Sequence, residues 1–568
     1  MSAAAQQAEN DDHADFAVPL DSLLADAANG SLGRFLPGTE GLLFGAALAR
    51  QPRNVARRLG GLAADLGRIA VGLSDIEPSR RDGRFKDPAW NGNPFFKRCV
   101  QSYLASAGTL QQLFDDVELD LQSERRLQLV IDNIIGAAAP SNMLWLNPTA
   151  LKAIIDTGGT SVLRGARNLC RDMARAPRVP AMVDKSKFAV GESLATTPGE
   201  VVLRTPEFEL IQYRPTTAEV RKVPLLMVPP MINKFYILDV AEGRSMVEYL
   251  VGQGQQVFMI SWRNPTAKHA GWGMDTYINA VLEAMAATRQ ICRVDSTIVH
   301  GTCAGGIISA MTAAYLARME RADELEALVL GVTLLDQADG GTTGAIMDRA
   351  RADAAIAMSS AIGYLDGRNL AEVFAWLRPT DLVWSFWVNN YLLGKSPPAF
   401  DVLYWNSDTT RMPARLHHDF LDMSINNKLV TADHAEVMGE TIDLSEVTQD
   451  AYIIGGETDH ITPWQNCYRT TGLLGGNSRF VLSTGGHIAA QVLPPENTKA
   501  SFRSIDNDNL SEPGDFAAQA EEHEGSWWID YGAWLGARSG ETKNAPKTLG
   551  RGRFRPLGAA PGTYVLDK

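Results

Sequence analysis

The feature that most constrains the fold is a short strand, a glycine turn containing a cysteine, and a helix, which follow one another within residues 296–319. The β-branched run at 297–299 is typical of a buried parallel strand. Cys303 follows in the spacing G-x-C-x-G, and good helix formers continue to Met319. This order places Cys303 at the carboxyl end of the sheet, where the dipole of the following helix favours a thiolate. The pattern predicts a nucleophile, although an ordinary turn with a small buried cysteine has the same spacing.

Short strands alternate with helical segments after about residue 198. The β-type runs lie at 200–204, 208–214, 224–228, 256–261, 297–299, 327–335, 450–455 and 479–482. Such alternation predicts an α/β fold with a mostly parallel sheet that is covered by helices. Active sites of these folds lie at the carboxyl ends of the strands.

The chain has 568 residues, which is too long for one typical domain. We expect a disordered tail at 1–15, a mainly helical N-terminal domain at 16–197 and a catalytic domain at 198–568. An insertion at about 336–445 interrupts the sheet pattern and is predicted to form a cap over the active site. Its large aromatic residues are expected to be mostly core, with the alternative that a few line an apolar tunnel or a lid. They are Phe374, Trp376, Trp384, Phe386, Trp387, Tyr391, Phe400, Tyr404 and Trp405.

Composition and motifs exclude several function classes. The formal net charge of −13 argues against nonspecific nucleic-acid binding. The five cysteines are scattered without a C-x-x-C pair, which fits a reducing cytoplasm, and the nine histidines form no metal motif. Gly252-Gln-Gly254 precedes its strand and Gly340-Gly341 lacks the phosphate-loop lysine, so no nucleotide cofactor is indicated. We also expect no secretory signal and no transmembrane segment.

Acidic and histidine residues follow the last two predicted strands. Asp459 comes after the strand at 452–456, and His487 comes after the strand at 479–482. Nucleophile, then acid, then histidine is the chain order of α/β-hydrolases. His487 would take the proton of the Cys303 thiol, and Asp459 would fix the imidazole tautomer. Glu457 remains an alternative acid and His460 an alternative histidine.

Two backbone donors are expected to stabilise an oxyanion. One is the N–H of Ala304, directly after the nucleophile. The other should come from the loop at 229–233. Met231 is the candidate donor, and the other residues of this loop remain alternatives. His300, beside the turn, is expected to be a packed polar residue.

Several stretches resemble the poly(3-hydroxyalkanoate) synthases, the polymerases of storage polyesters. The box at 301–306 is similar to the lipase-like box of that family, and the similarity extends from about residue 80 to the end of the sequence. The other matching stretches are 85–90, 229–239, 261–265, 404–406, 459–464, 486–488 and 525–528. The resemblance implies an α/β-hydrolase fold with Cys303, Asp459 and His487 as the catalytic triad. The length resembles the self-sufficient class I and class II forms, which need no second subunit.

The resemblance implies polymerisation of (R)-3-hydroxyacyl-CoA with release of CoA, through a covalent thioester on Cys303. It also implies a homodimer, no cofactor, and a cytoplasmic enzyme that is attached to the growing polyester granule. A rival interpretation is an α/β-hydrolase with a cysteine nucleophile, an esterase or thioesterase. A third is a non-enzymatic granule-coating protein with a degenerate fold. The length of the monomer side chain is left open.

Overall fold

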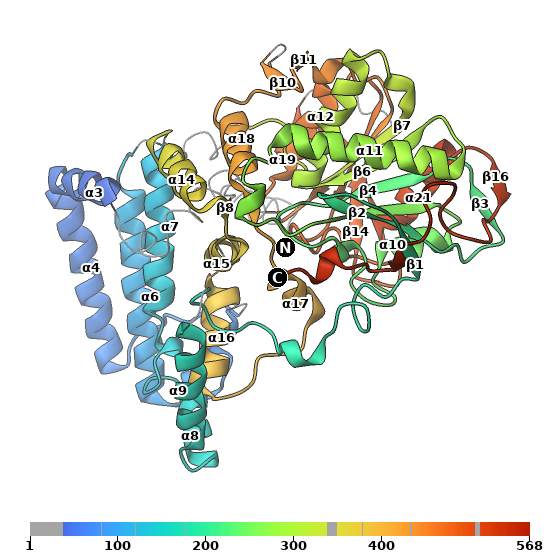
Figure 1. The fold of residues 1–568 in the computed structure, drawn as a ribbon. Helices are drawn as coiled ribbons and strands as arrows, with labels where there is room; N and C mark the ends of the chain where they lie inside the picture. The colour runs from blue at the N-terminus through green and yellow to red at the C-terminus, as the bar shows by residue number, and fades with distance from the viewer. Residues whose placement is uncertain are drawn as a thin grey trace. The chain divides into compact units, whose positions relative to one another are not determined.

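The computed structural model describes residues 38–80, 82–119, 121–174, 177–337, 349–377, 379–431, 434–459, 461–505 and 512–568. The chain divides into two compact units, which are drawn together in Figure 1. The catalytic unit contains Ser186–Gly367 and Asp401–Lys568. The helical unit contains the described part of Asn29–Lys185 together with Arg368–Phe400.

An eleven-stranded sheet forms the centre of the catalytic unit, in the order β15-β14-β13-β12-β7-β6-β4-β5-β2-β1-β17. The six strands from β13 to β5 run parallel, and the strands at both edges are antiparallel. The predicted mostly parallel sheet is therefore confirmed. The strands are β1 (Gly199–Arg204), β2 (Phe208–Tyr213), β4 (Leu225–Val228), β5 (Val257–Trp262), β6 (Thr297–Thr302), β7 (Leu325–Gly331), β12 (Ala451–Gly456), β13 (Ser478–Ser483), β14 (Ser501–Ser504), β15 (Glu521–Glu524) and β17 (Gly558–Ala559).

The strand order reverses at β4, which lies between β5 and β6. At such a switch point the loops at the carboxyl ends diverge and leave room for a ligand. Helices α10 (Met246–Gly252) and α21 (Trp527–Arg538) pack on one face of the sheet, in a core shared with β6, β7 and β12. Helices α11 (Met274–Cys292) and α12 (Ala304–Arg318) cover the other face (Figure 1). The burial of the central strands between these layers explains their continuous apolar runs.

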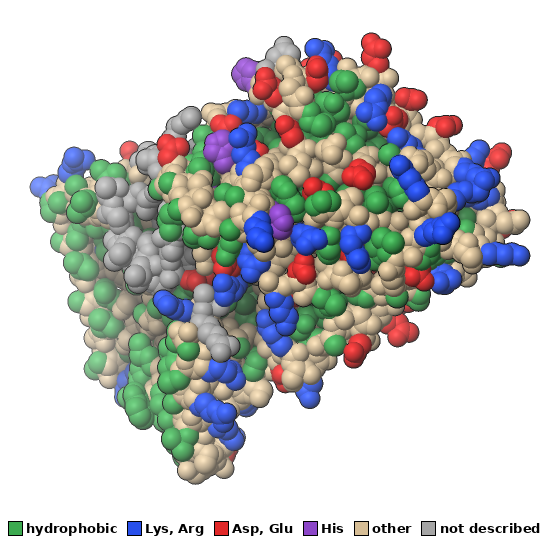
Figure 2. Space-filling view, viewed as in Figure 1, with side chains coloured by type: hydrophobic (Ala, Val, Ile, Leu, Met, Phe, Trp, Pro, Cys, Tyr) green, Lys and Arg blue, Asp and Glu red, His purple; other side chains and the backbone are tan. Residues whose placement is uncertain are grey.

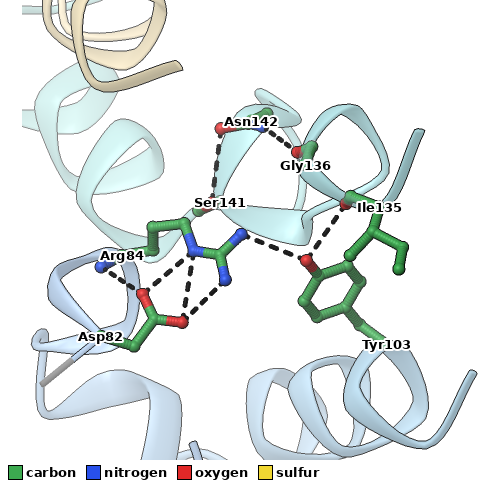
Figure 3. A network of polar contacts seen from close by, with 7 residues as sticks. All are labelled: Asp82, Arg84, Tyr103, Ile135, Gly136, Ser141 and Asn142. Carbon is green, nitrogen blue, oxygen red and sulfur yellow. Dashed lines mark hydrogen bonds and ion pairs between the residues drawn. The ribbon is translucent and has the colours of Figure 1, made fainter. Parts of the chain in front are cut away.

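The helical unit is built mainly from long helices of the N-terminal half. They are α3 (Gly38–Arg50), α4 (Pro52–Val71), α6 (Pro94–Asp115), α7 (Leu121–Ala137), α8 (Pro148–Asp156) and α9 (Thr160–Met173). A polar network stabilises their packing (Figure 3). Arg84 pairs with Asp82 and donates to the hydroxyl of Tyr103 at 3.1 Å, and this hydroxyl donates to the Ile135 carbonyl at 3.1 Å. The network connects α6 to α7.

The region predicted as a cap insertion is divided between the two units. Trp384, Trp387 and Tyr391 pack edge to face along η8 (Thr380–Trp384), α16 (Ser385–Trp387) and η9 (Val388–Leu392). They belong to the helical unit, where Trp387 donates to the Asn142 carbonyl at 3.1 Å. The grouping of 368–400 with the N-terminal helices could not be read from chain order, and the domain limits given above stay a prediction.

The other described elements extend the catalytic unit. They include α14 (Arg349–Ile362), β8 (Tyr364–Leu365), α17 (Asp401–Asn406), β9 (Met412–Pro413), α18 (Ala414–Ile425), β10 (Ala435–Val437), β11 (Glu440–Ile442), α19 (Trp464–Leu473) and the pair β3 (Glu219–Arg221) with β16 (Thr542–Asn544). Helix α15 (Gly367–Leu377) belongs to the helical unit from Arg368 onward. Among the described residues, no helix has both the length and the apolar character needed to cross a membrane.

Candidate active site

Cys303 occupies a strained turn between β6 and α12. Its backbone angles are φ 52° and ψ −123°, and its N–H donates to the Gly331 carbonyl of neighbouring β7 at 2.8 Å. A non-glycine residue in such a conformation stores about 1–3 kcal/mol of strain, which only a well-packed surrounding can hold. The strand, the strained turn and the helix form a nucleophile elbow, with a cysteine in the place of the usual serine.

Three glycines around Cys303 allow this turn because no side chain would fit there. A Cβ on Gly305 would lie 2.3 Å from the Val228 carbonyl oxygen and 2.6 Å from that of Pro229. A Cβ on Gly306 would lie 1.9 Å from the Thr333 hydroxyl, and one on Gly301 would lie 2.5 Å from Ser309 Oγ. The first turn of α12 therefore rests directly against the end of β4.

Asp459 and His487 follow the neighbouring strands β12 and β13, whose last residues Gly456 and Ser483 are paired. The Nδ1 of His487 lies 2.7 Å from Asp459 Oδ2, and both side chains are buried. Since an ionised carboxylate only accepts, Nδ1 carries the proton and donates it. Nε2 is then the nitrogen left to exchange a proton with a substrate or a nucleophile.

The electrostatics of the site couple all three predicted residues. Burial alone would lower the pKa of His487, but the charges of Asp459 and Cys303 and hydrogen bonds with both raise it to about 10. Burial opposes the ionisation of Asp459, yet the charge and hydrogen bond of His487 and the bonds from Thr462 hold the pKa of this carboxyl below its usual value. Asp459 is thus ionised at neutral pH. Sulfur, imidazole and carboxylate in this order are suited to nucleophilic acyl transfer.

Thr462 also belongs to this cluster, and the sequence analysis missed it. Its hydroxyl donates to Asp459 Oδ2 at 2.7 Å and lies 3.2 Å from His487 Nδ1. A hydroxyl residue three positions after an acid is a common local capping pattern, so the sequence offered only a weak signal.

The alternative residues make other contacts or lie outside the described residues. Glu457 pairs with Arg503, and His460 lies outside the described residues. His300 is packed as expected, since it is buried and its Nδ1 lies 2.8 Å from the Tyr531 hydroxyl. Within the described part of the chain, no group of three or more His, Cys, Asp or Glu side chains could hold a metal.

The two predicted oxyanion donors lie on two segments that meet in the fold, since Gly305 packs against the carbonyls of Val228 and Pro229. Ala304 is the first residue of α12, and Met231 lies in the loop after β4 on which that helix rests. Both are buried, and the Met231 carbonyl accepts from the Thr410 hydroxyl at 2.7 Å. This bond engages only the carbonyl group of Met231. Donation by the N–H of Met231 to an oxyanion stays a prediction.

Comparison with known proteins identifies two family models along the chain. Residues 81–250 match the model described as Poly-beta-hydroxybutyrate polymerase (PhaC) N-terminus, and residues 231–490 match the alpha/beta hydrolase fold. The predicted fold class is thereby confirmed.

Curated relatives match over most of their length. Poly(3-hydroxyalkanoate) polymerase 2 of Ectopseudomonas oleovorans is 42% identical over 91% of this chain and 92% of its own. Poly(3-hydroxyalkanoate) polymerase subunit PhaC of Cupriavidus necator is 39% identical over 88% of this chain and 85% of its own. These matches confirm the resemblance noted in the sequence. The chain belongs to the poly(3-hydroxyalkanoate) polymerase family, and it is therefore an acyltransferase with an α/β-hydrolase fold.

Proposed function

We propose that this enzyme polymerises (R)-3-hydroxyacyl-CoA into poly(3-hydroxyalkanoate) and releases CoA, with Cys303, Asp459 and His487 as its catalytic residues. The observation that carries the assignment of residues is the imidazole of His487, which is held at 2.7 Å by Asp459 and whose pKa is raised by Asp459 and by nearby Cys303. The family relationship supports the reaction.

The first step is acylation of Cys303. The sulfur attacks the thioester carbonyl, a new C–S bond forms, and the C–S bond to CoA breaks. The thiol proton is held on His487 and then passes to the departing CoA sulfur. The N–H groups of Ala304 and Met231 stabilise the oxyanion, and a donor of this kind contributes about 10² to 10³ in rate. Exchange of one thioester for another is nearly isoenergetic, so the acyl group stays activated.

The second step lengthens the chain. His487 accepts the proton of the 3-hydroxyl of a bound acyl unit, and this oxygen attacks the second acyl carbonyl. An ester C–O bond forms and a thioester C–S bond breaks, with the proton returned to the departing sulfur. Water must be excluded, since it would hydrolyse the thioester. No cofactor is required, because the CoA thioester is itself the activated substrate.

Association with the polyester granule and homodimer formation are part of the proposal. Figure 2 shows hydrophobic side chains gathered on the helical unit over α4, α8 and α9. They include large exposed residues such as Leu59, Leu66, Ile155 and Leu163. Contiguous exposed apolar surface marks interaction sites, and a polyester surface or a second copy would cover it.

Incubation with (R)-3-hydroxybutyryl-CoA tests the proposal. We expect CoA release and insoluble polymer from the wild type and neither from Cys303→Ala. CoA release with free hydroxy acid as the main product would instead identify a thioesterase. Unchanged CoA release by Cys303→Ala would remove the triad from the reaction.

A further inference from the structure

The carboxylate of Asp459 is saturated by four donors, and one of them comes from the side chain of Thr462. Oδ1 accepts the backbone N–H groups of Ile461 at 2.8 Å and Thr462 at 3.0 Å. Oδ2 accepts His487 Nδ1–H and the Thr462 hydroxyl, both at 2.7 Å. A carboxylate has about four lone-pair positions, so every position is used.

We propose that Thr462 is a positioning residue that fixes His487 through Asp459, and that the saturated Asp459 never takes a proton from the substrate hydroxyl. This inference rests on the proposed function and deepens it, because it assigns the base of both steps to His487 alone. Asp459 has a fully buried side chain as well as no free lone pair. A hydroxyl of the substrate would have to displace one of its four donors to reach it.

The Thr462 hydroxyl orients the dyad that Asp459 and His487 form. It shares Oδ2 with His487 and lies 3.2 Å from Nδ1, so it limits rotation of both the carboxylate and the ring. Thr462 is itself buried, and its carbonyl lies 3.7 Å from the sulfur of Cys467 on α19. The other titratable groups that face the dyad are Cys303 after β6 and Cys467, whose burial raises its pKa. Cys467 is therefore neutral at working pH, and Asp459 and His487 are the groups whose titration governs the site.

Three variants test this role. Thr462→Val keeps the shape and removes the hydroxyl, and Thr462→Ser restores it. Thr470→Val is the matched control, because Thr470 is buried on nearby α19 and its hydroxyl has no hydrogen-bond partner among the described residues. The readouts are CoA release against pH and substrate concentration, and the melting temperature. CoA release is common to polymerisation and hydrolysis, so this test is independent of which product forms.

We expect Thr462→Val to lower kcat about tenfold, as the loss of one hydrogen bond to a charged group predicts, with KM nearly unchanged. The low-pH limb of kcat should move to higher pH, since the hydroxyl holds the pKa of Asp459 down. Thr462→Ser and Thr470→Val should resemble the wild type in both respects. Equal losses in Thr462→Val and Thr462→Ser, or a Thr462→Val variant with the kcat and pH profile of Thr470→Val, would overturn the proposal. A failure of the proposed function would show separately, as free hydroxy acid in place of polymer from the wild type.

Discussion

Replacement of Gly305 by alanine should disable the site without touching any reacting atom. The added Cβ would lie 2.3 Å from the Val228 oxygen and 2.6 Å from the Pro229 oxygen, both of which are backbone atoms. Ordinary contact requires about 3.4 Å or more, so α12 and the end of β4 must separate by about 1 Å. That movement displaces Cys303 and Ala304 from the Met231 loop. A misplacement of about 1 Å can cost about 10²-fold in rate, or about 2.7 kcal/mol of transition-state stabilisation.

The assay is steady-state CoA release, accompanied by thermal unfolding and by alkylation of Cys303. Alanine has a better helix propensity than glycine by about 1 kcal/mol, so propensity alone would stabilise the variant. Gly472→Ala on α19 is the matched control, because an added Cβ there meets nothing within 4 Å. We expect near wild-type turnover from Gly472→Ala and about a hundredfold loss from Gly305→Ala. A Gly305→Ala variant with full turnover would refute the reasoning that this contact sets the oxyanion geometry.

Four further variants test the site and one buried ion pair elsewhere in the catalytic unit. Asp459→Asn should lower kcat by about 10³- to 10⁴-fold in acylation and elongation alike, whereas Glu457→Gln should retain activity in the same CoA-release assay. Cys303→Ala should lower the pKa of His487 from about 10 in an NMR titration, because the sulfur raises it. The stability that a raised histidine pKa contributes is complete below about pH 6.5 and is lost as the pH rises through 10. On raising the pH, unfolding curves of this variant should therefore show the loss of that stability at a lower pH than those of the wild type. Lys234→Met should reduce the free energy of unfolding by up to about 3 kcal/mol in urea melts, because it leaves the partly buried Asp408 without its 3.1 Å ion pair.

The sequence predicted best those elements whose local residue pattern alone determines their structure. The central strands lie where the apolar runs predicted them, because parallel strands buried on both faces need continuous apolar sequence. The residues that follow β6, β12 and β13 meet at one edge because parallel strands share their carboxyl ends. The proximity of Asp459 to His487 follows from this topology, and Asp459 rather than Glu457 contacts the imidazole.

Features that depend on packing between distant segments could not be predicted. The edge strand β15 has the sequence Glu-Glu-His-Glu, which carries no strand signal and is held by pairing with β14. The aromatic residues Trp384 and Trp387 would suit a cap as well as they suit the helical unit to which they belong. The core of a cap and the core of a helical unit are both rich in aromatic side chains, so the sequence alone does not distinguish them. Thr462 is conspicuous only once Asp459 and His487 have been brought together in space.

The most direct test of the central claim is to trap the acyl group on the enzyme and locate it. Cleavage after Arg293 and Arg318 yields a peptide, residues 294–318, in which Cys303 is the only cysteine. After brief incubation with (R)-3-hydroxybutyryl-CoA and acid quenching, mass spectrometry should find the hydroxybutyryl group on this peptide and on no other. Acylation of a peptide that contains Cys99, Cys170, Cys292 or Cys467 instead, or continued turnover with an unmodified Cys303 peptide, would contradict the account.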